Sequence, residues 1–217
     1  YTTNTSQSDM TYWIINGVAV VRTTTGTSTT TNANSTSTTE SSQTNHYNAY
    51  GQVTGATGTS TTTTDAEVIH GNGTEHLISV TSATNVYAPI WGQAALVSST
   101  TRSNGNVVGN TTTDSVSETN YTYTALGQML GGQGTSTSVS KTKNEDGTID
   151  QSDTNTTNYF GNAWGQAILT GSVQTTSGWN VNQTVENTST TSTDYYYSNG
   201  AMIGAKATLT GTKTEKV

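Results

Sequence analysis

Residues 159–171 read YFGNAWGQAILTG, an aromatic pair followed by a Gly-Gln step and a run of small and aliphatic side chains. Five other segments also have an aromatic residue followed, four to six residues later, by a glycine and a run of small residues: TYWIINGVAVV from Thr11, HYNAYGQVTGATG from His46, VYAPIWGQAALV from Val86, YTYTALGQMLGG from Tyr121 and YYYSNGAMIGAKA from Tyr195. Their aligned glycines are Gly17, Gly51, Gly92, Gly127, Gly165 and Gly200, at intervals of 34, 41, 35, 38 and 35 residues. A near-constant interval over six copies indicates an internal repeat.

Four copies continue from the glycine to a glutamine, at Gln52, Gln93, Gln128 and Gln166. The aromatic residues recur at one end of every copy, and we interpret them as a hydrophobic cluster that anchors the sheet or a subunit contact. The residues chosen for this role are Tyr12, Trp13, Tyr50, Trp91, Trp164 and Tyr196. A row of exposed aromatic rings that binds carbohydrate and one aromatic girdle of a membrane barrel are the alternative functions for this set.

The composition favours strands and argues against disorder. Hydrophobic residues make up 29% of the chain and charged residues 10%, against about 45–50% and about 25% in ordinary domains. Threonine is the main filler, and its branched Cβ favours strands, whereas disordered chains are usually rich in Pro and net charge. The chain has a single proline.

Turn signals lie between the copies and predict the strand connections. Asn72-Gly73, Asn104-Gly105, Asp146-Gly147 and Ser177-Gly178 each fall about midway between two repeat glycines. Such pairs suit two-residue hairpin turns, because these turns require positive φ. We therefore predict an all-β, up-and-down antiparallel meander of about eleven strands, each of about 14–16 residues, forming an extended sheet, a sandwich or a barrel. A β-solenoid is the alternative, although it needs no chain reversal at these pairs.

The predicted organisation is an N-terminal arm, residues 1–10, and one repetitive β domain, residues 11–217. Its repeats span approximately residues 11–45, 46–85, 86–120, 121–158, 159–194 and 195–217. The apolar residues occupy only one end of each repeat, and the other end offers hydroxyl groups on both faces. Such a sheet cannot bury enough apolar surface to fold alone, so we expect neighbouring copies to stabilise it.

These features predict an extracellular or cell-surface structural protein that assembles with copies of itself into a filament, sheath or surface layer. An outer-membrane β-barrel and a Thr-rich adhesin or ice-binding module are the alternatives. Three lysines near the C-terminus, Lys206, Lys213 and Lys216, partly protect one sheet edge from strand addition. The net charge of −7, with only seven Lys and Arg, argues against nucleic acid as a partner, while cell-surface glycans remain candidates.

No catalytic constellation is present, so we expect no enzyme activity, no cofactor and no metal. His70 and His76 flank a predicted turn, and Glu145, Asp146 and Asp150 cluster at another, but turn formation accounts for both groups. The absence of cysteine excludes disulfides and thiolate metal sites. Eight Asn-x-Ser/Thr sequons occur, and the candidate glycosylation sites among them are Asn34, Asn72, Asn110, Asn155 and Asn187.

Overall fold

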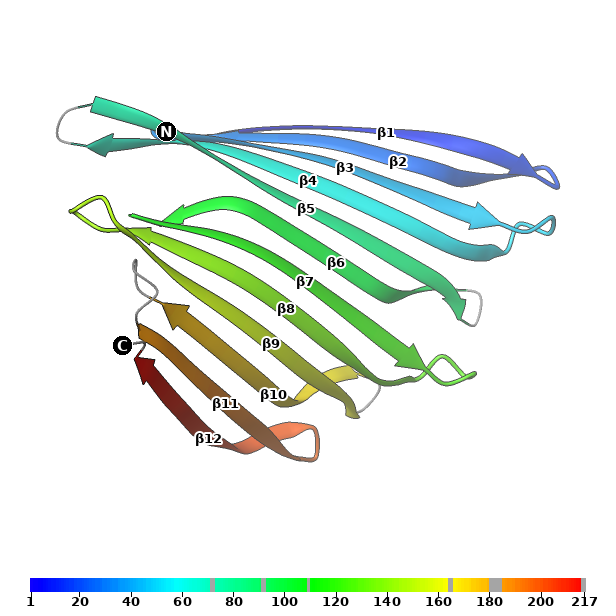
Figure 1. Cartoon of the computed structure of the whole chain (residues 1–217). Helices are drawn as coiled ribbons and strands as arrows, with labels where there is room; N and C mark the ends of the chain where they lie inside the picture. The colour runs from blue at the N-terminus through cyan, green and yellow to red at the C-terminus, as the bar shows by residue number, and fades with distance from the viewer. Residues whose placement is uncertain (71–72, 91–92, 109, 164–165, 180–184, 216–217) are drawn as a thin grey trace. The chain divides into compact units, whose positions relative to one another are not determined.

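A computed structural model describes residues 1–70, 73–90, 93–108, 110–163, 166–179 and 185–215, and these residues form twelve β-strands and no helix (Figure 1). The strands are β1 (Thr3–Ile15), β2 (Val18–Thr31), β3 (Ser35–Tyr47), β4 (Val53–His70), β5 (Gly73–Ile90), β6 (Gln93–Val108), β7 (Thr111–Tyr123), β8 (Met129–Lys143), β9 (Ile149–Ala163), β10 (Gln166–Trp179), β11 (Val185–Ser198) and β12 (Ala201–Glu215).

The predicted up-and-down antiparallel meander is confirmed. The strand order is β1 to β12 without a crossover, which also excludes the solenoid arrangement. The strands are 13–18 residues long, close to the predicted length. There are twelve rather than about eleven strands in the described parts of the chain, because residues 3–10, assigned above to an arm, form most of β1.

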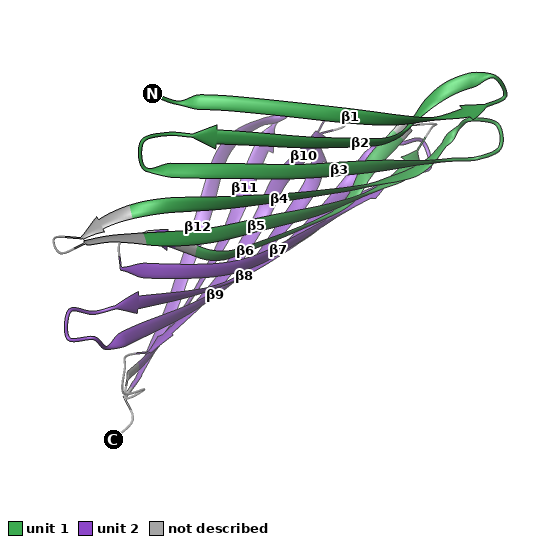
Figure 2. Cartoon of the chain, turned by 90° about the horizontal axis from the view of Figure 1, so that it is seen from above, with its two compact units in different colours: residues 1–106 green, residues 107–217 purple. Residues whose placement is uncertain are grey.

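The chain divides into two compact units, Tyr1–Asn106 and Val107–Val217, which Figure 2 shows in green and purple. The first unit contains β1–β5 and nearly all of β6, and the second contains the last two residues of β6 and β7–β12. Within each unit the strands lie side by side in a single layer (Figure 1). Each unit is therefore a sheet with two faces and no second layer of its own to cover either of them.

The four repeat glycines that the structure describes, Gly17, Gly51, Gly127 and Gly200, lie in hairpin turns and not in the middle of strands. Asn16 and Gly17 have φ of 51° and 79°, and Asn199 and Gly200 have φ of 48° and 76°. Both pairs connect strands directly, Ile15 opposite Val18 and Ser198 opposite Ala201. Two successive positive φ angles define the type I′ turn, which Asn-Gly favours because its twist matches that of the strands.

Gly51 and Gly127 are the last residues of three-residue hairpin loops, which differ from the two-residue type I′ turns at Gly17 and Gly200. In each loop the glycine N–H donates to the carbonyl three residues earlier, Asn48 or Thr124, at 3.0 Å. The glycines have φ of 80° and 77°, as expected for a type I turn followed by a bulge glycine. The loop at Gly147 has the same hydrogen bonds and a φ of 83°, so the turn predicted at Asp146-Gly147 is confirmed.

Other strand boundaries predicted from the sequence are wrong. The segment from Tyr159 is not one strand, because Gln166 pairs with Ala163 across a hairpin. The residues between them, Trp164 and Gly165, lie outside the described residues. Asn104-Gly105 lies within β6 and Ser177-Gly178 within β10, so neither pair makes the predicted turn. Asn72 is outside the described residues, and Gly73 begins β5.

Six hairpins contain the repeat motif, and in the described residues of each one a β-bulge lies close to the turn. The extra residue stands opposite a Tyr or Phe near the turn, and the bulged residues are Arg22, Thr54, Val97, Leu130, Thr170 and Ile203. On the turn side of each bulge an aromatic ring pairs with an aliphatic residue. These pairs are Tyr12–Val21, Tyr47–Val53, Tyr87–Leu96, Tyr123–Met129, Phe160–Leu169 and Tyr197–Met202. The sixfold repeat read from the sequence is thus a repeat of bulged hairpins.

Very few side chains of the described residues are buried. Among the described residues the buried hydrophobic side chains are those of Ala56, which is 2% exposed, and Met129, which is 7% exposed. The chain exposes 13795 Å², whereas two compact domains of half its 22.7 kDa mass would together expose about 11,500 Å². The units therefore leave uncovered the surface that ordinary domains place in a core.

Candidate functional site: the aromatic ends of the hairpins

The turns alternate between two kinds of end in each unit. We call aromatic ends the hairpin turns that join β1 to β2, β3 to β4, β5 to β6, β7 to β8, β9 to β10 and β11 to β12. The opposite turns, where hydroxyl-rich strands meet, are polar ends. Most of the exposed large hydrophobic side chains among the described residues lie at or near the aromatic ends, and they include Tyr12, Trp13, Ile14, Val18, Tyr50, Leu126, Leu130, Tyr159, Tyr196, Met202 and Ile203. Tyr1, Ile78, Ile149 and Leu209 are exposed elsewhere.

The aromatic residues also connect neighbouring hairpins within a unit. The Tyr47 hydroxyl donates to the Val21 carbonyl at 2.8 Å, and the Tyr197 hydroxyl donates to the Leu169 carbonyl at 2.8 Å. Each accepting residue immediately precedes a bulged residue, Arg22 or Thr170. A bulge disrupts the ladder of backbone hydrogen bonds, so these hydroxyls satisfy carbonyls next to the disruption.

A third hairpin pair makes the equivalent contact with a different side chain. The ring next to this bulge is Phe160, which lacks a hydroxyl, and the Asn162 amide donates instead to the Met129 carbonyl. Met129 precedes the bulged Leu130. The Phe160 ring contacts Tyr121, with 6.2 Å between centroids, and burial raises the pKa of nearby Tyr123. The side chain that reaches back to the preceding hairpin is therefore part of the structural repeat.

The predicted aromatic residues have different surroundings. Tyr12 and Tyr196 are 56% and 47% exposed, and Tyr50 projects from its turn at 82%. The Arg22 guanidinium lies over the Trp13 ring, 4.7 Å from its centroid, as a cation–π contact. Trp91 and Trp164 lie outside the described residues. The exposed rings at these ends are available for contacts beyond the subunit.

The Gly-Gln motif has a local role in the turns. The backbone carbonyl of Gln52 accepts a hydrogen bond from the backbone N–H of Asn48. The backbone N–H of Gln52 donates in return to Asn48 Oδ1, at 3.0 Å. Thr124 and Gln128 are connected in the same way, with Thr124 Oγ1 as the acceptor. Gln93 and Gln166 begin β6 and β10, while Gly92 lies outside the described residues. The motif specifies a turn, and no ligand site is needed to explain it.

The candidate glycosylation sites that the structure describes are all exposed. Asn34 and Asn110 lie at polar-end turns, and Asn155 and Asn187 lie in β9 and β11. Asn72 lies outside the described residues. A sugar chain on Asn34 or Asn110 would project from a turn, whereas one on Asn155 or Asn187 would project from the face of the sheet.

Hydroxyl side chains form rows that cross several strands. In the first unit Ser6, Ser28, Thr39, Thr62, Thr81 and Ser103 stand opposite one another on β1 to β6. Thr39 bonds Thr62 at 2.9 Å, and Thr81 bonds Ser103 at 3.1 Å. The second unit has a similar row of Ser115, Ser138, Thr154, Thr176 and Ser189. Such pairs contribute about 0.2–1 kcal/mol each, which supports a sheet without a core.

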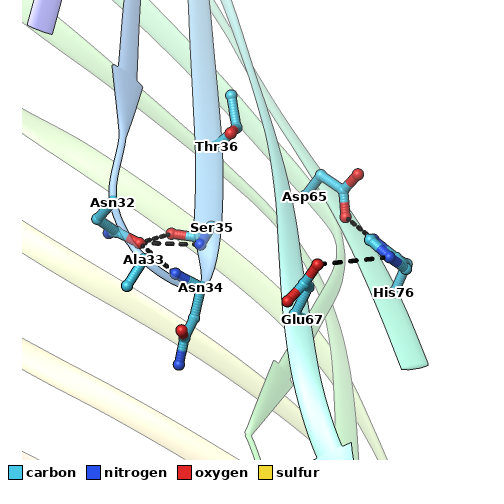
Figure 3. Close-up of a pocket in the computed structure, with 8 residues that line it drawn as sticks. All are labelled: Asn32, Ala33, Asn34, Ser35, Thr36, Asp65, Glu67 and His76. Atoms are coloured by element: carbon cyan, nitrogen blue, oxygen red, sulfur yellow. Dashed lines mark hydrogen bonds and ion pairs between the residues drawn. The ribbon is translucent and has the colours of Figure 1, made fainter. Parts of the chain in front are cut away.

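The shallow polar pocket in Figure 3 contains the one histidine cluster found in the described residues. His76 Nδ1 lies 3.0 Å from Asp65 Oδ1, and His76 Nε2 lies 3.8 Å from Glu67 Oε1. The Asn32 side chain caps the neighbouring turn by accepting from the Ser35 N–H at 2.8 Å. No group of His, Asp and Glu among the described residues has the geometry of a metal site. The pocket is a surface ion pair beside a turn.

The ion pair predicts a titration that can be measured. The hydrogen bond that His76 donates to Asp65, together with the charge of Asp65, raises the pKa of His76 above 6.5. Loss of hydration opposes the rise, and the charge of Glu67 adds to it. A raised folded-state pKa stabilises the fold fully below pH 6.5 and ceases to do so as pH rises through the folded value. In an NMR titration, Asp65→Asn should return the His76 pKa towards 6.5, and Glu67→Gln should lower it less. An unchanged pKa in Asp65→Asn would contradict the assigned cause.

Comparisons with protein-family models, with curated proteins and with solved structures find no match to this chain. No helix in the described parts of the chain is long and apolar enough to cross a membrane. The functional argument therefore rests on the geometry of the sheet.

Proposed function

We propose that this protein is an extracellular structural protein, a subunit that assembles with copies of itself into a filament, sheath or surface layer through β-sheet contacts. The observation that carries the proposal is the near absence of buried apolar side chains in the described residues, where only Ala56 and Met129 are buried. A sheet with a full complement of strands and no core needs another surface to cover it.

The energetics favour assembly over a solitary subunit. Ordering the backbone costs about 1–2 kcal/mol per residue, and in ordinary domains apolar burial offsets most of that cost. Here bulky side chains such as Ile14 and Ile203, which are 71% and 68% exposed, contribute little until something covers them. Burial of one such side chain contributes about 1.5–3 kcal/mol. Copies of the chain offer matching apolar ends and matching hydroxyl rows as the covering surface.

The composition supports an exterior location and a self-association partner. With charged residues at only 10%, few like charges oppose close approach of copies. Exposed sequons at Asn34 and Asn110 offer sites for glycosylation in a secreted protein, and cell-surface glycans are a second class of partner. The proposed role involves no catalysis, cofactor or nucleic acid.

The test is assembly of the purified chain. Negative-stain electron microscopy and analytical ultracentrifugation over a concentration series should show ordered polymers above a critical concentration, together with a rise in thermal stability. Monomers that are stable and unchanged in stability at every concentration would refute the proposal, because the missing core would then be unnecessary.

A Thr-rich adhesin or ice-binding module is the second candidate, and the hydroxyl rows favour it. Regular rows such as Ser28, Thr39 and Thr62 present hydroxyls across adjacent strands, about 4.7–4.9 Å apart. Ice-recrystallisation and glycan-array assays on the monomer distinguish this candidate from a structural subunit. Thr39→Val, within the row, should abolish such binding and leave polymer formation intact.

A further inference from the structure

We propose that subunits join head to tail, with the outer edge of β12 pairing with β1 of a second copy in the geometry that β10 and β11 adopt within one chain. This inference deepens the proposed function and rests on it. The two strands are terminal in the strand order, so each has one side without a neighbouring strand in the sheet. Both are exposed along nearly their whole length.

The direction of the strands suits the junction. β12 begins at an aromatic end and runs to a polar end, whereas β1 begins at a polar end and runs to an aromatic end. Aligning the aromatic ends of two copies therefore makes β12 and the incoming β1 antiparallel, like the terminal pairs β1–β2 and β11–β12. The contact uses two different surfaces, so it does not close as a twofold dimer does. Repeated from copy to copy, it gives an open filament, or a ring where the rotation per subunit closes.

The register follows from two strand pairs in which a tyrosine reaches back to a bulge. Between β2 and β3, the residue after the bulge, Thr23, pairs with Thr44, three residues before Tyr47. Between β10 and β11, the residue after the bulge, Gly171, pairs with Asp194, three residues before Tyr197. Both pairs share one geometry even though they belong to different units. The β4–β5 and β8–β9 pairs have another register, in which Ala56 pairs with Tyr87 and Gly132 with Phe160. The junction is assigned the β10–β11 register because Asp9 and Tyr12 repeat the spacing of Asp194 and Tyr197.

The same rule gives a single register at the junction. The residue after the last bulge is Gly204, and the residue three positions before Tyr12 is Asp9. Gly204 opposite Asp9 reproduces the Gly171–Asp194 pair residue for residue. A Cβ at Gly204 would meet nothing within 4 Å in the subunit, so an incoming strand has room to approach there. The free edge thus carries the same Gly and Asp-x-x-Tyr pattern as an internal strand pair.

The Tyr12 side chain completes the match. Among the described residues, the Tyr12 hydroxyl donates a hydrogen bond to Met10 Sδ, at 3.6 Å, and Tyr12 is 56% exposed. In the junction it takes the place of Tyr197 and donates to the carbonyl of Met202, which precedes the last bulge as Leu169 precedes its own. Each aromatic end would then be connected to the one before it across the subunit boundary.

The charges of the two edges are complementary. Asp9 is the only charged residue of β1, and Lys206 lies two positions from Gly204 on β12. Lys206 already stands opposite Asp194 of its own chain. In the junction it faces Gln7 directly and Asp9 diagonally, a spacing of about 7–8 Å that a lysine side chain can span. Lys206 therefore attracts the β1 edge of another copy, and it still disfavours pairing with other strand edges.

Cysteine cross-linking tests this register on the full chain, which has no cysteine of its own. Ser6 stands opposite Ala207 in the junction, and opposite residues of antiparallel strands are close enough for a disulfide. The Ser6→Cys and Ala207→Cys variants, mixed and treated with a mild oxidant during assembly, should give mainly mixed covalent dimers. The Ser6→Cys with Thr212→Cys mixture is the off-register control, at a distance of about 17 Å along the strand.

The contact of the Tyr12 hydroxyl is tested separately, by the critical concentration for assembly. Tyr12→Phe should raise the critical concentration about two- to tenfold, while Tyr50→Phe, at an exposed turn, should leave it unchanged. Polymers that form without the mixed dimer, or that give mainly Ser6–Ser6 dimers, overturn the junction and leave the proposed function standing. Failure to polymerise at all overturns the proposed function, and the junction with it.

Discussion

Gln7→Lys is expected to raise the critical concentration for assembly about tenfold to a hundredfold without unfolding the subunit. In the junction Gln7 of one copy faces Lys206 of another, so the variant places two ammonium groups directly opposite each other. Like charges juxtaposed at an interface cost up to several kcal/mol, and each 1.4 kcal/mol is a factor of ten in affinity. Gln7 is exposed on an edge strand, so the fold itself should tolerate the change.

The measurement is the polymer fraction by sedimentation over a concentration series at low and high salt. Gln7→Glu is the matched control, because it sets a carboxylate against Lys206 and should assemble at least as well as the wild type. Glu40→Gln, at an exposed site on the inner strand β3, controls for net charge because it also changes the charge by +1. High salt should narrow the deficit of Gln7→Lys, since exposed charges are screened. Equal critical concentrations for Gln7→Lys and Gln7→Glu would contradict the register.

The repeat, the all-β class, the strand length and the lack of a core could all be predicted from the sequence. Each depends on local composition: β-branched threonine, short apolar stretches and regularly spaced glycine. The hairpin at Asp146-Gly147 was also predictable, because polar residues flank it on both sides. These are properties that a segment carries before it meets any other segment.

The turns at the repeat motif were missed for a physical reason. Asn16-Gly17 satisfies the same rule as Asp146-Gly147, but apolar residues on both sides gave it the appearance of a continuous strand. An exposed apolar hairpin is unusual in a subunit that folds alone, and reasoning that assumes a core places the turn elsewhere. The Asn-Gly pair itself was the signal that would have located the turn.

The bulges and the tyrosine contacts could not be predicted from local sequence. Tyr47 and Val21 are 26 residues apart, and Tyr197 and Leu169 are 28 apart. Their contact depends on register between neighbouring hairpins, which turn geometry and bulges jointly determine. The shared Asp-x-x-Tyr pattern at Asp9 and Asp194 gains meaning only once the strand pairing is known.

Gly131→Ala is expected to destabilise the second unit by about 1–3 kcal/mol, a large effect for a single methyl group in a sheet without a core. A Cβ at Gly131 would lie 2.6 Å from the Phe160 carbonyl oxygen of the neighbouring strand. That oxygen belongs to the backbone, so the strain is relieved only by moving β9 away from β8. The movement would also disturb the Asn162 contact with the Met129 carbonyl.

Gly178→Ala is the matched control on an inner strand of the same unit. Its new Cβ would meet the Gln151 carbonyl at 3.6 Å, an ordinary contact. Alanine also restricts the unfolded chain, so this variant should be as stable as the wild type or more stable by up to about 1 kcal/mol. Urea unfolding followed by far-UV circular dichroism, below the critical concentration, measures both. Equal midpoints for the two variants would show that β8 and β9 are not packed as closely as the glycines require, because only close strand approach distinguishes the two sites.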